Sequence, residues 1–447
     1  MKKYDSYKES GVEWIGEIPK HWYVKRLKNI GSLYSGLSGK SGSDFEKVPT
    51  ENFKPFINFT NIANNKYIVG DNFGFVKIDE NENQNQVKKN DLFFLMSSEN
   101  QEDVGKSALL LNDYDELYLN SFCKGFRLTI NSDARFINYL LTSSALSQLI
   151  SLEGRGFTRI NLRMEGVENL PIILPQSIEE QTVIANYLDH KTTQIDHLIA
   201  KKEQFIKLLE EERIAVINQA VTKGLDPSVP MKDSGIEWLG EIPAHWEVSS
   251  IKFHAKIQNG STPSSSNEEF WNGDVNWVTT DDLGKLEDKN IYKTRRTITK
   301  LGYESCGTTL APIDSIVIST RAPIGHIGIL KIEASTNQGC KTIIPISINP
   351  LFCFYYFLNS KEILQSMGQG STFKELPTSS LKDFKIVFPK SIEEQQEISK
   401  FLEFKNDEID KIKSKSNQEI ELLKEYKTAL ISDVVTGKLD VRNEKLN

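Results

Sequence analysis

One tetrapeptide in the chain approaches a catalytic motif. The run Asn349-Pro350-Leu351-Phe352 differs at one position from the Asn-Pro-Pro-Phe type of sequence used by methyltransferases. Such an enzyme also needs a cofactor loop of the Phe-x-Gly-x-Gly type, and none precedes this segment. Because four-residue matches are common, we interpret the segment as the turn before a helix over 351–360. We therefore expect a chain that is not an enzyme and that binds no cofactor of its own.

Glycine, cysteine and histidine residues predict no further catalytic or metal site. The segments "GRGFT" (154–158) and "GQGST" (368–372) lack the Gly-x-x-x-x-Gly-Lys-Ser/Thr spacing of a nucleotide loop. We interpret them as loops where the backbone approaches another surface, such as a DNA phosphate. The four cysteines contain no Cys-x-x-Cys pair, which predicts reduced, mostly buried thiols. His21 and His245 lie in a repeated segment and are predicted to be structural.

Arginines and short polar side chains form a pattern that suits DNA binding. Arg155, Arg159 and Arg163 follow a glycine turn at four-residue steps. Arginine reads guanine edges and also binds phosphates, while hydroxyl and amide groups contact either. Any one of these residues could equally be an ordinary surface residue. The candidate DNA contacts are Lys40, Ser97, Ser98, Asn100, Gln101, Arg155, Arg159, Arg163, Thr262, Thr279, Thr280, Arg295, Arg296, Arg321 and Lys374.

The charge of the chain limits unaided DNA binding. The formal net charge is −7, and the two middle regions, about 25–174 and 249–388, are close to electroneutral. Non-specific affinity for DNA comes from lysine and arginine that neutralise phosphates. We therefore expect partner subunits to supply part of the affinity.

Two repeated segments frame the candidate residues. The sequence "SGVEWIGEIPKHW" (10–22) returns as "SGIEWLGEIPAHW" (234–246), and residues 175–226 return in similar form at 389–440. Matches of this length indicate an internal duplication. The repeated tryptophans are expected in a core or at a subunit contact, with base stacking as the alternative; they are Trp14, Trp22, Trp238 and Trp246.

The later repeat predicts two long helices. Ser177 precedes Glu180, and Ser391 precedes Glu394, at the spacing of a capping box. In such a box the glutamate side chain accepts the backbone N–H of the capping serine. Apolar residues then recur at three- and four-residue steps, which predicts coiled-coil helices, the first from 177 to about 220. The apolar stripes should pack on each other through Ile184, Leu188, Ile195, Leu198 and Leu209 against Ile398, Leu402, Ile409, Ile412 and Leu423.

The repeats divide the chain into six parts. These are a conserved segment (1–24), a variable domain (25–174), a long helix (175–224), a linker with the second conserved segment (225–248), a second variable domain (249–388) and a second long helix (389–440). Apolar runs at 91–97 and 314–320 predict buried strands. Cys123 aligns with Cys340, so we expect both variable domains to share one mixed α/β fold with diverged surfaces.

This arrangement resembles the specificity subunit of type I restriction-modification systems. The likeness spans essentially the whole chain and rests on the repeated S-G-x-E-W-x-G-E-I-P-x-H-W and P-x-S-I-E-E-Q sequences. The segments at 259–283 and 319–328 are similar to parts of that family's target-recognition domains, whereas the sequence of the first variable domain differs from them. The resemblance implies an α+β fold: two α/β target-recognition domains joined and separated by two antiparallel coiled-coil helices, with a pseudo-two-fold repeat.

The resemblance also implies a function and partners. The chain would read a split site on double-stranded DNA and scaffold two methyltransferase subunits, which use S-adenosylmethionine. Two restriction subunits, which use ATP and Mg²⁺, would complete a larger complex. The charged outer face of the helices would either dock the methyltransferase or simply be solvated.

The sequence disfavours two other functions. A methyltransferase or nuclease activity on this chain is disfavoured by the missing cofactor loop. A purely structural coiled-coil adaptor does not explain why constant segments frame variable domains. No stretch approaches eighteen apolar residues, and no apolar core follows the first lysines, so we expect a cytoplasmic protein without a membrane partner.

Overall fold

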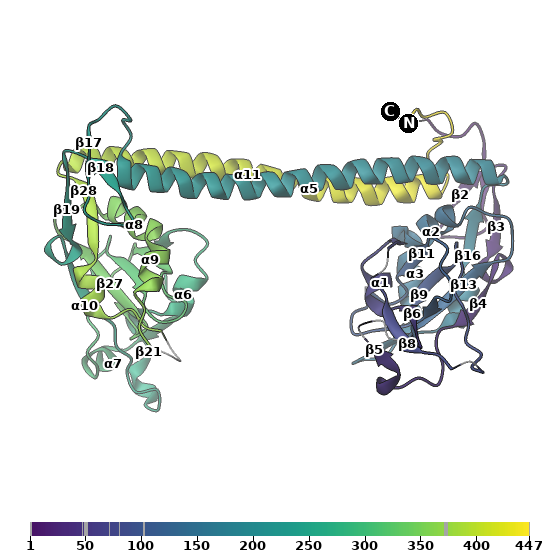
Figure 1. Ribbon diagram of the computed structural model, residues 1–447, viewed down its shortest axis with the longest axis horizontal. Helices are drawn as coiled ribbons and strands as arrows, with labels where there is room; N and C mark the ends of the chain where they lie inside the picture. Colours follow the sequence, from purple (N-terminus) through teal and green to yellow (C-terminus); the bar gives the residue numbers. More distant parts are fainter. Residues whose placement is uncertain are drawn as a thin grey trace. The chain divides into compact units, whose positions relative to one another are not determined.

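The chain forms two compact units. A computed structural model describes residues 2–46, 48, 52–70, 72–79, 81–101, 103–370 and 374–446. The first unit comprises Met1–Lys202 and Asn417–Asn447, and the second comprises Glu203–Ser416. Each unit contains one variable domain, one copy of the repeated tryptophan segment and part of each long helix (Figure 1). The duplication seen in the sequence is therefore a duplication of whole units.

Both variable domains are built on the same five-stranded sheet. In the first unit its spatial order is β4 (Gly31–Ser35), β13 (Cys123–Leu128), β9 (Leu92–Leu95), β11 (Ser107–Leu110) and β7 (Tyr67–Ile68). In the second it is β20 (Ala255–Asn259), β27 (Cys340–Pro345), β24 (Ile316–Ser319), β25 (Ile327–Leu330) and β22 (Asn290–Ile291). The predicted apolar strands, β9 and β24, are buried along their whole length. Cys123 and Cys340 begin equivalent strands, so the predicted common fold is confirmed.

Smaller sheets distinguish the two domains. The first unit adds a sheet of β12 (Tyr118–Leu119), β6 (Phe53–Ile57), β8 (Gly74–Lys77) and β5 (Phe45–Glu46), and another of β10 (Ser97–Ser98), β15 (Ile160–Leu162) and β14 (Gly154–Arg155). The second unit has β23 (Arg296–Ile298), β21 (Trp271–Val278) and β26 (Ser335–Thr336). Many of the candidate DNA contacts lie on or beside these small sheets.

Short helices complete each domain. The first unit contains α1 (Phe59–Ala63), α2 (Ala134–Thr142), α3 (Ser144–Leu152) and α4 (Met164–Glu168). The second contains α6 (Thr280–Gly284), α7 (Lys300–Glu304), α8 (Pro350–Asn359), α9 (Lys361–Ser366) and α10 (Thr378–Asp383). Asn349 caps α8 by accepting the N–H groups of Leu351 and Phe352, each at 3.0 Å. The near-match to a catalytic tetrapeptide is therefore a helix start, as predicted.

The repeated tryptophan segment forms a hairpin in each unit. Strand β1 (Tyr7–Glu9) pairs with β2 (Glu17–Pro19), and β17 (Met231–Asp233) pairs with β18 (Glu241–Pro243). The turns need glycine, because Gly11 and Gly16 have φ of 72° and 66°. The chain then enters β3 (Tyr23–Arg26) or β19 (Trp246–Ser250). These strands pair with β16 (Pro171–Leu174) and β28 (Lys385–Pro389), which lead into the long helices.

The predicted capping boxes are only half correct. The Ser177 hydroxyl accepts the N–H of Glu180, and the Ser391 hydroxyl accepts that of Glu394, both at 3.2 Å. The glutamate side chains bind the tryptophan segment instead of the cap. Glu180 accepts a hydrogen bond from the Trp22 indole and contacts His21. The indole is a buried donor, and the carboxylate accepts its hydrogen bond. This contact joins the two repeated segments within each unit.

The long helices, α5 (Ile178–Lys223) and α11 (Ile392–Val435), contain no glycine or proline. Gly224 and Gly437, both with φ of 75°, follow their ends, as is typical of helix termini. In the first unit Asp196 pairs with Lys427 at 2.7 Å, and Lys202 pairs with Glu419. In the second unit Glu210 pairs with Lys413, and Arg213 with Asp410. Within each unit the helices therefore run antiparallel.

Most of the predicted apolar positions of the long helices are buried. Seven are buried and Leu423 is partly buried; the buried ones are Ile184, Leu188, Ile195, Leu209, Ile398, Leu402 and Ile409. The predictions for Leu198 and Ile412 are wrong, because these side chains are 43% and 42% exposed.

Their neighbours explain these two errors. Leu198 and Ile199 are adjacent, so either could follow Ile195 on one helix face, and it is Ile199 that packs against the core. After Ile409 the next buried positions of α11 are Ser416 and Ile420, which leaves Ile412 outside.

Candidate nucleic-acid interface

Four predicted contacts of the first unit lie on or beside the small sheet β10–β15–β14. Arg159 donates from Nε to the Ser97 hydroxyl at 2.7 Å, and its guanidinium lies 5.0 Å from the Phe122 ring centre. Arg155 donates to the Leu152 carbonyl at 2.6 Å. Both arginines are exposed. Ser97 and Ser98 are buried, so they support the sheet and are wrongly predicted as direct contacts.

The other candidates of this domain have mixed outcomes. Asn100 is exposed, and Gln101 donates to the Ser151 carbonyl of α3 at 2.6 Å. Arg163 is exposed and pairs with Glu153 at 3.3 Å. Lys40 is poorly accessible for a DNA contact: its side chain is 7% exposed and pairs with Glu82. The hydrogen bond from Lys40 holds the pKa of Glu82 below its usual range.

One aromatic residue was missed by the sequence reasoning. Phe157 lies in the loop between β14 and β15, flanked by Arg155 and Arg159, and is fully exposed. Gly156, with φ of 133°, has no room for a side chain, because a Cβ there would lie 2.1 Å from the Arg159 carbonyl oxygen. An exposed aromatic ring between two arginines suits the stacking and phosphate contacts of nucleic-acid binding. The sequence Arg-Gly-Phe-Thr-Arg, with an aromatic residue between two arginines, could have indicated this exposed ring.

In the second unit, Thr279, Arg295 and Arg296 line one cavity of about 410 Å³. The guanidinium of Arg296 lies 4.0 Å from the Trp271 ring centre and 5.5 Å from that of Trp277. These rings restrict the guanidinium plane, which favours planar recognition of a base edge or phosphate. Trp277, Asp281 and Asn337 complete the lining, and no motif in the sequence had predicted them.

The threonines of this unit are less free than predicted. Thr279 caps α6 and donates to Asp282 at 2.6 Å. Thr262 is hydrogen-bonded to Gln338, and Thr280 is partly buried. The hydroxyls of Thr279 and Thr262 are therefore already engaged within the domain, and only Thr279 lines the cavity.

Arg321 and Lys374 lie at a second position of this domain. Arg321 donates from Nε to Glu375 at 3.0 Å, and its backbone bridges that of Glu375. Lys374 is exposed. Beside them, burial lowers the pKa of Lys341, which donates to the Leu376 carbonyl at 2.8 Å. Of the "GQGST" loop, Ser371 and Thr372 lie outside the described residues.

Carboxylates already partner several candidate cations. Arg163, Arg295 and Arg321 each pair with an acidic residue of their own domain. Exposed pairs of this kind contribute only about 0–1 kcal/mol, so a DNA phosphate can replace the carboxylate at little cost. The same exchange is harder for Lys40, because its side chain is only 7% exposed.

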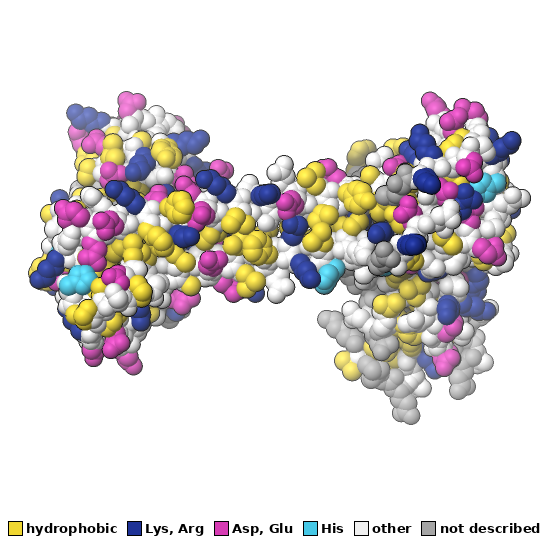
Figure 2. All heavy atoms as spheres, turned by 90° about the horizontal axis from the view of Figure 1, so that it is seen from above, with side chains coloured by type: hydrophobic (Ala, Val, Ile, Leu, Met, Phe, Trp, Pro, Cys, Tyr) yellow, Lys and Arg dark blue, Asp and Glu magenta, His cyan; other side chains and the backbone are white. Residues whose placement is uncertain are grey.

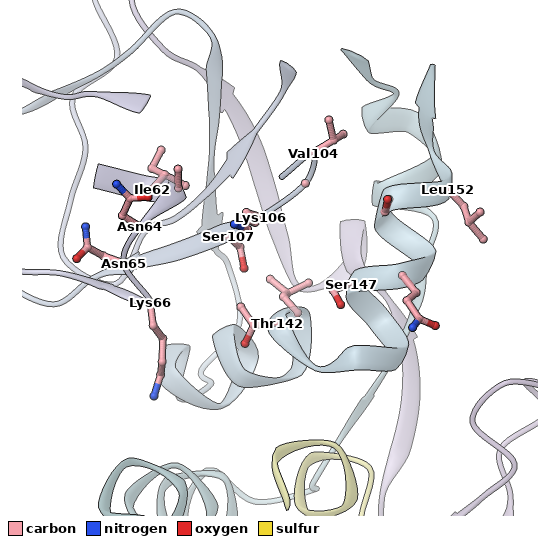
Figure 3. A pocket seen from close by; sticks show the side chains of 15 residues that line it. Ile62, Asn64, Asn65, Lys66, Val104, Lys106, Ser107, Thr142, Ser147 and Leu152 are labelled. Carbon is pink, nitrogen blue, oxygen red and sulfur yellow. The ribbon is translucent and has the colours of Figure 1, made fainter. Parts of the chain in front are cut away.

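A cavity of about 780 Å³ lies elsewhere in the first unit, between α1, β11, α2 and α3 (Figure 3). None of the candidate DNA contacts lines it. Lys66 stands at its edge and points away, toward the long helices (Figure 3). Among the residues that the structure describes, no cluster of His, Cys, Asp or Glu could hold a metal ion. In that same part of the chain, no helix has the length and apolarity needed to span a membrane.

Comparison with known sequences gives a consistent result. A family model described as the type I restriction modification DNA specificity domain matches residues 19–208 and 243–422. The chain is similar to the MjaIX specificity subunit of Methanocaldococcus jannaschii, with 38% identity over 41% of this chain and 43% of that relative. This match thus spans less than half of that relative. The putative MjaX specificity subunit of the same organism is 28% identical over 98% of both chains.

Solved structures share the fold. A chain from a study of assembly and conformational transition in a type I restriction-modification system matches with a TM-score of 0.74. It is 16% identical and covers 94% of this chain and 99% of its own. The HsdS subunit from Thermoanaerobacter tengcongensis matches with a TM-score of 0.60, also at 16% identity, over 94% of this chain and 98% of its own.

Proposed function

This chain belongs to the family of type I restriction-modification DNA specificity subunits, and from that premise we propose that its two variable domains read the two halves of a split site on double-stranded DNA. One observation carries the proposal: the same scaffold occurs twice with different surfaces. The first domain offers the exposed loop of Arg155, Phe157 and Arg159, and the second offers the cavity beside Arg296. Different surfaces on equivalent scaffolds suit two different base sequences.

The proposed partners are two methyltransferase subunits, one for each unit. In the second unit the helices expose large apolar side chains, among them Phe205 (45%), Leu208 (52%) and Phe404 (60%). In the first unit Leu198, Leu422 and Tyr426 are exposed in the same way. Figure 2 shows hydrophobic side chains gathered along the helices. Contiguous apolar surface of this kind marks a protein contact, and a repeated scaffold suits two copies of one partner.

The chemistry is proposed to lie on the partners. S-adenosylmethionine would bind to the methyltransferase subunits, and ATP with Mg²⁺ to two restriction subunits where these are present. The chain described here would select the DNA site and hold the assembly together without catalysing a step.

Reconstitution tests this proposal. The purified chain, the methyltransferase subunit encoded with it and their mixture would each be assayed for methyl transfer from S-adenosylmethionine to genomic DNA. We expect transfer only from the mixture, and a complex whose mass corresponds to two methyltransferase copies per chain. Methyl transfer by the rigorously purified chain would refute the non-catalytic role.

A further inference from the structure

A cluster of polar contacts joins the first variable domain to helix α5. Asp189 of α5 pairs with Lys66 at 3.0 Å and accepts hydrogen bonds from the hydroxyls of Tyr67 at 2.6 Å and Tyr139 at 2.8 Å. Lys66 precedes the edge strand β7, and Tyr139 lies on α2. The ammonium of Lys66 lies 3.4 Å from the Tyr139 ring centre. One carboxylate of the long helix thus holds two separate elements of the domain.

The second unit contains two equivalent contacts with α11, one from a lysine and one from a tyrosine. Glu403 of α11 pairs with Lys289 at 2.7 Å and accepts a hydrogen bond from the Tyr355 hydroxyl. Lys289 precedes the edge strand β22, and Tyr355 lies on α8. Asn406 donates to the Tyr355 hydroxyl at 2.9 Å, where the first unit has Thr192 at 3.2 Å from Tyr139. We call the two clusters, Lys66–Tyr139–Asp189 and Lys289–Tyr355–Glu403, the polar joints.

The members of the two joints occupy equivalent positions. Each lysine directly precedes the last strand of a five-stranded sheet, and each tyrosine lies six residues after the cap of its helix, Asp133 or Asn349. Each carboxylate lies twelve residues after the serine that begins its long helix. The surrounding sequences differ, so an equivalent triad, with Asp189 in one unit and Glu403 in the other, occurs in two domains of different sequence.

Apolar contacts alone would hold each domain on its helix less specifically. In the first unit Ile184 and Leu188 of α5 belong to the same buried core as Ile137 and Leu140 of α2. Such burial stabilises the contact but is non-directional. Partly buried ion pairs add little net stability, and their best-attested role is to fix one geometry among several. Burial lowers the pKa of Lys66 to about 8, although the neighbouring Asp189 acts to raise it. Burying the charged lysine therefore costs free energy, and an apolar side chain would fill this space at a lower cost.

We propose that the two polar joints set the angle at which each recognition domain stands on its long helix, and thereby the number of base pairs accepted between the two half-sites. Lys66, Tyr139 and Asp189 in one unit, and Lys289, Tyr355 and Glu403 in the other, are positioning residues that touch no DNA. This inference rests on the proposed function and extends it. Half-site spacing follows from the geometry of the protein, so a loosened joint widens the range of spacers while the bases read in each half stay the same.

The test uses the full complex in a host that lacks other DNA methylation. Methylome sequencing of the parent chain identifies the split motif and its spacer. Glu403→Gln removes the charge but keeps an acceptor, and Tyr355→Phe removes the hydroxyl but keeps the ring. We expect either variant to methylate sites whose spacer differs by one base pair about tenfold more often than the parent does, a change of about 1.4 kcal/mol in discrimination. The half-site bases should not change.

Glu408→Gln is the matched control, because Glu408 pairs with Lys405 of its own helix at 2.8 Å and should leave the spacer unchanged. A joint with a merely structural role would lower methylation at all sites together and keep the parental spacer, which would overturn the proposal. If Glu403→Gln does not fold, Tyr355→Phe still tests the proposal, because it retains the packing of the ring. Purified complexes would then be assayed for methylation of duplexes with the parental spacer and with one base pair more or fewer. If methylation by the parent complex shows no split motif, the proposed function is wrong. That outcome differs from a split motif whose spacer is unchanged in the variants, which would contradict only the role of the polar joints.

Discussion

The indole nitrogen of Trp22 donates a hydrogen bond of 3.1 Å to Oε1 of Glu180, a residue 158 positions later in the chain. The second unit repeats this contact between Trp246 and Glu394 at 2.9 Å. The Tyr4 hydroxyl donates to the same Glu180 oxygen at 3.0 Å. The contact ties the repeated hairpin to the first turn of a long helix, and so it links the two most similar segments of the duplication.

Removing this carboxylate should destabilise the first unit. Glu180→Ala leaves the buried indole of Trp22 without its acceptor, which typically costs about 1–3 kcal/mol. Urea unfolding of the parent and variant would measure the difference. Glu179→Ala is the matched control, because it removes an exposed glutamate from the same helix turn. Equal stability of the two variants would contradict the role assigned to the contact.

The sequence was sufficient to predict the duplication, the long helices and the buried strands. These follow from residue identity and apolar spacing over many positions, as with β9, β24 and the stripe through Leu188 and Leu402. Individual positions were harder. Leu198 and Ile199 are adjacent and both apolar, so periodicity does not decide which one faces the partner helix.

The candidate site was predicted less completely, because it depends on contacts between distant segments. Lys40 meets Glu82, and the Ser97 hydroxyl is covered by Arg159; neither contact follows from local sequence. Phe157 and the cavity beside Arg296 were missed for the same reason. The polar joints join residues as far apart as Lys66 and Asp189, which no motif connects.

The helix seam should show a contrast between buried and exposed leucines. Leu188→Ala opens a cavity at a fully buried site and should cost about 2–5 kcal/mol. Leu198→Ala changes a side chain that is 43% exposed and should alter stability by less than about 0.5 kcal/mol. Thermal and urea unfolding of both variants would measure these changes. A similar loss in both would show that Leu198 is also buried in the seam.

The cysteines should differ in reactivity. Cys123, Cys340 and Cys353 are buried, and burial raises the pKa of Cys123 to about 12. Cys306 is partly exposed. Because a reagent needs access to the thiol, a thiol reagent should modify one thiol per native chain and all four after denaturation. Cys306→Ser should abolish the native reaction. Rapid modification of more than one thiol in the folded chain would contradict the burial of the other three cysteines.

Arg296 should read a base in the half-site of the second domain. Its guanidinium is held beside two tryptophan rings, and loss of a bidentate base contact costs about 1–3 kcal/mol of discrimination. Arg296→Ala in the full complex should therefore relax one base position, as measured by methylome sequencing. Lys40→Ala is the control that should leave the motif unchanged. An even loss of binding across sequences, with a weaker salt dependence, would instead identify Arg296 as a phosphate contact.

Exchange of one recognition domain tests the central claim most directly. Residues 249–388 would be replaced by the corresponding domain of a related specificity subunit, and the methylome would be sequenced in a host that supplies the methyltransferase subunits. The two-reader account predicts that one half of the methylated motif changes while the other half and the spacer stay the same. A continuous motif, or an exchange that alters both halves together, would contradict it.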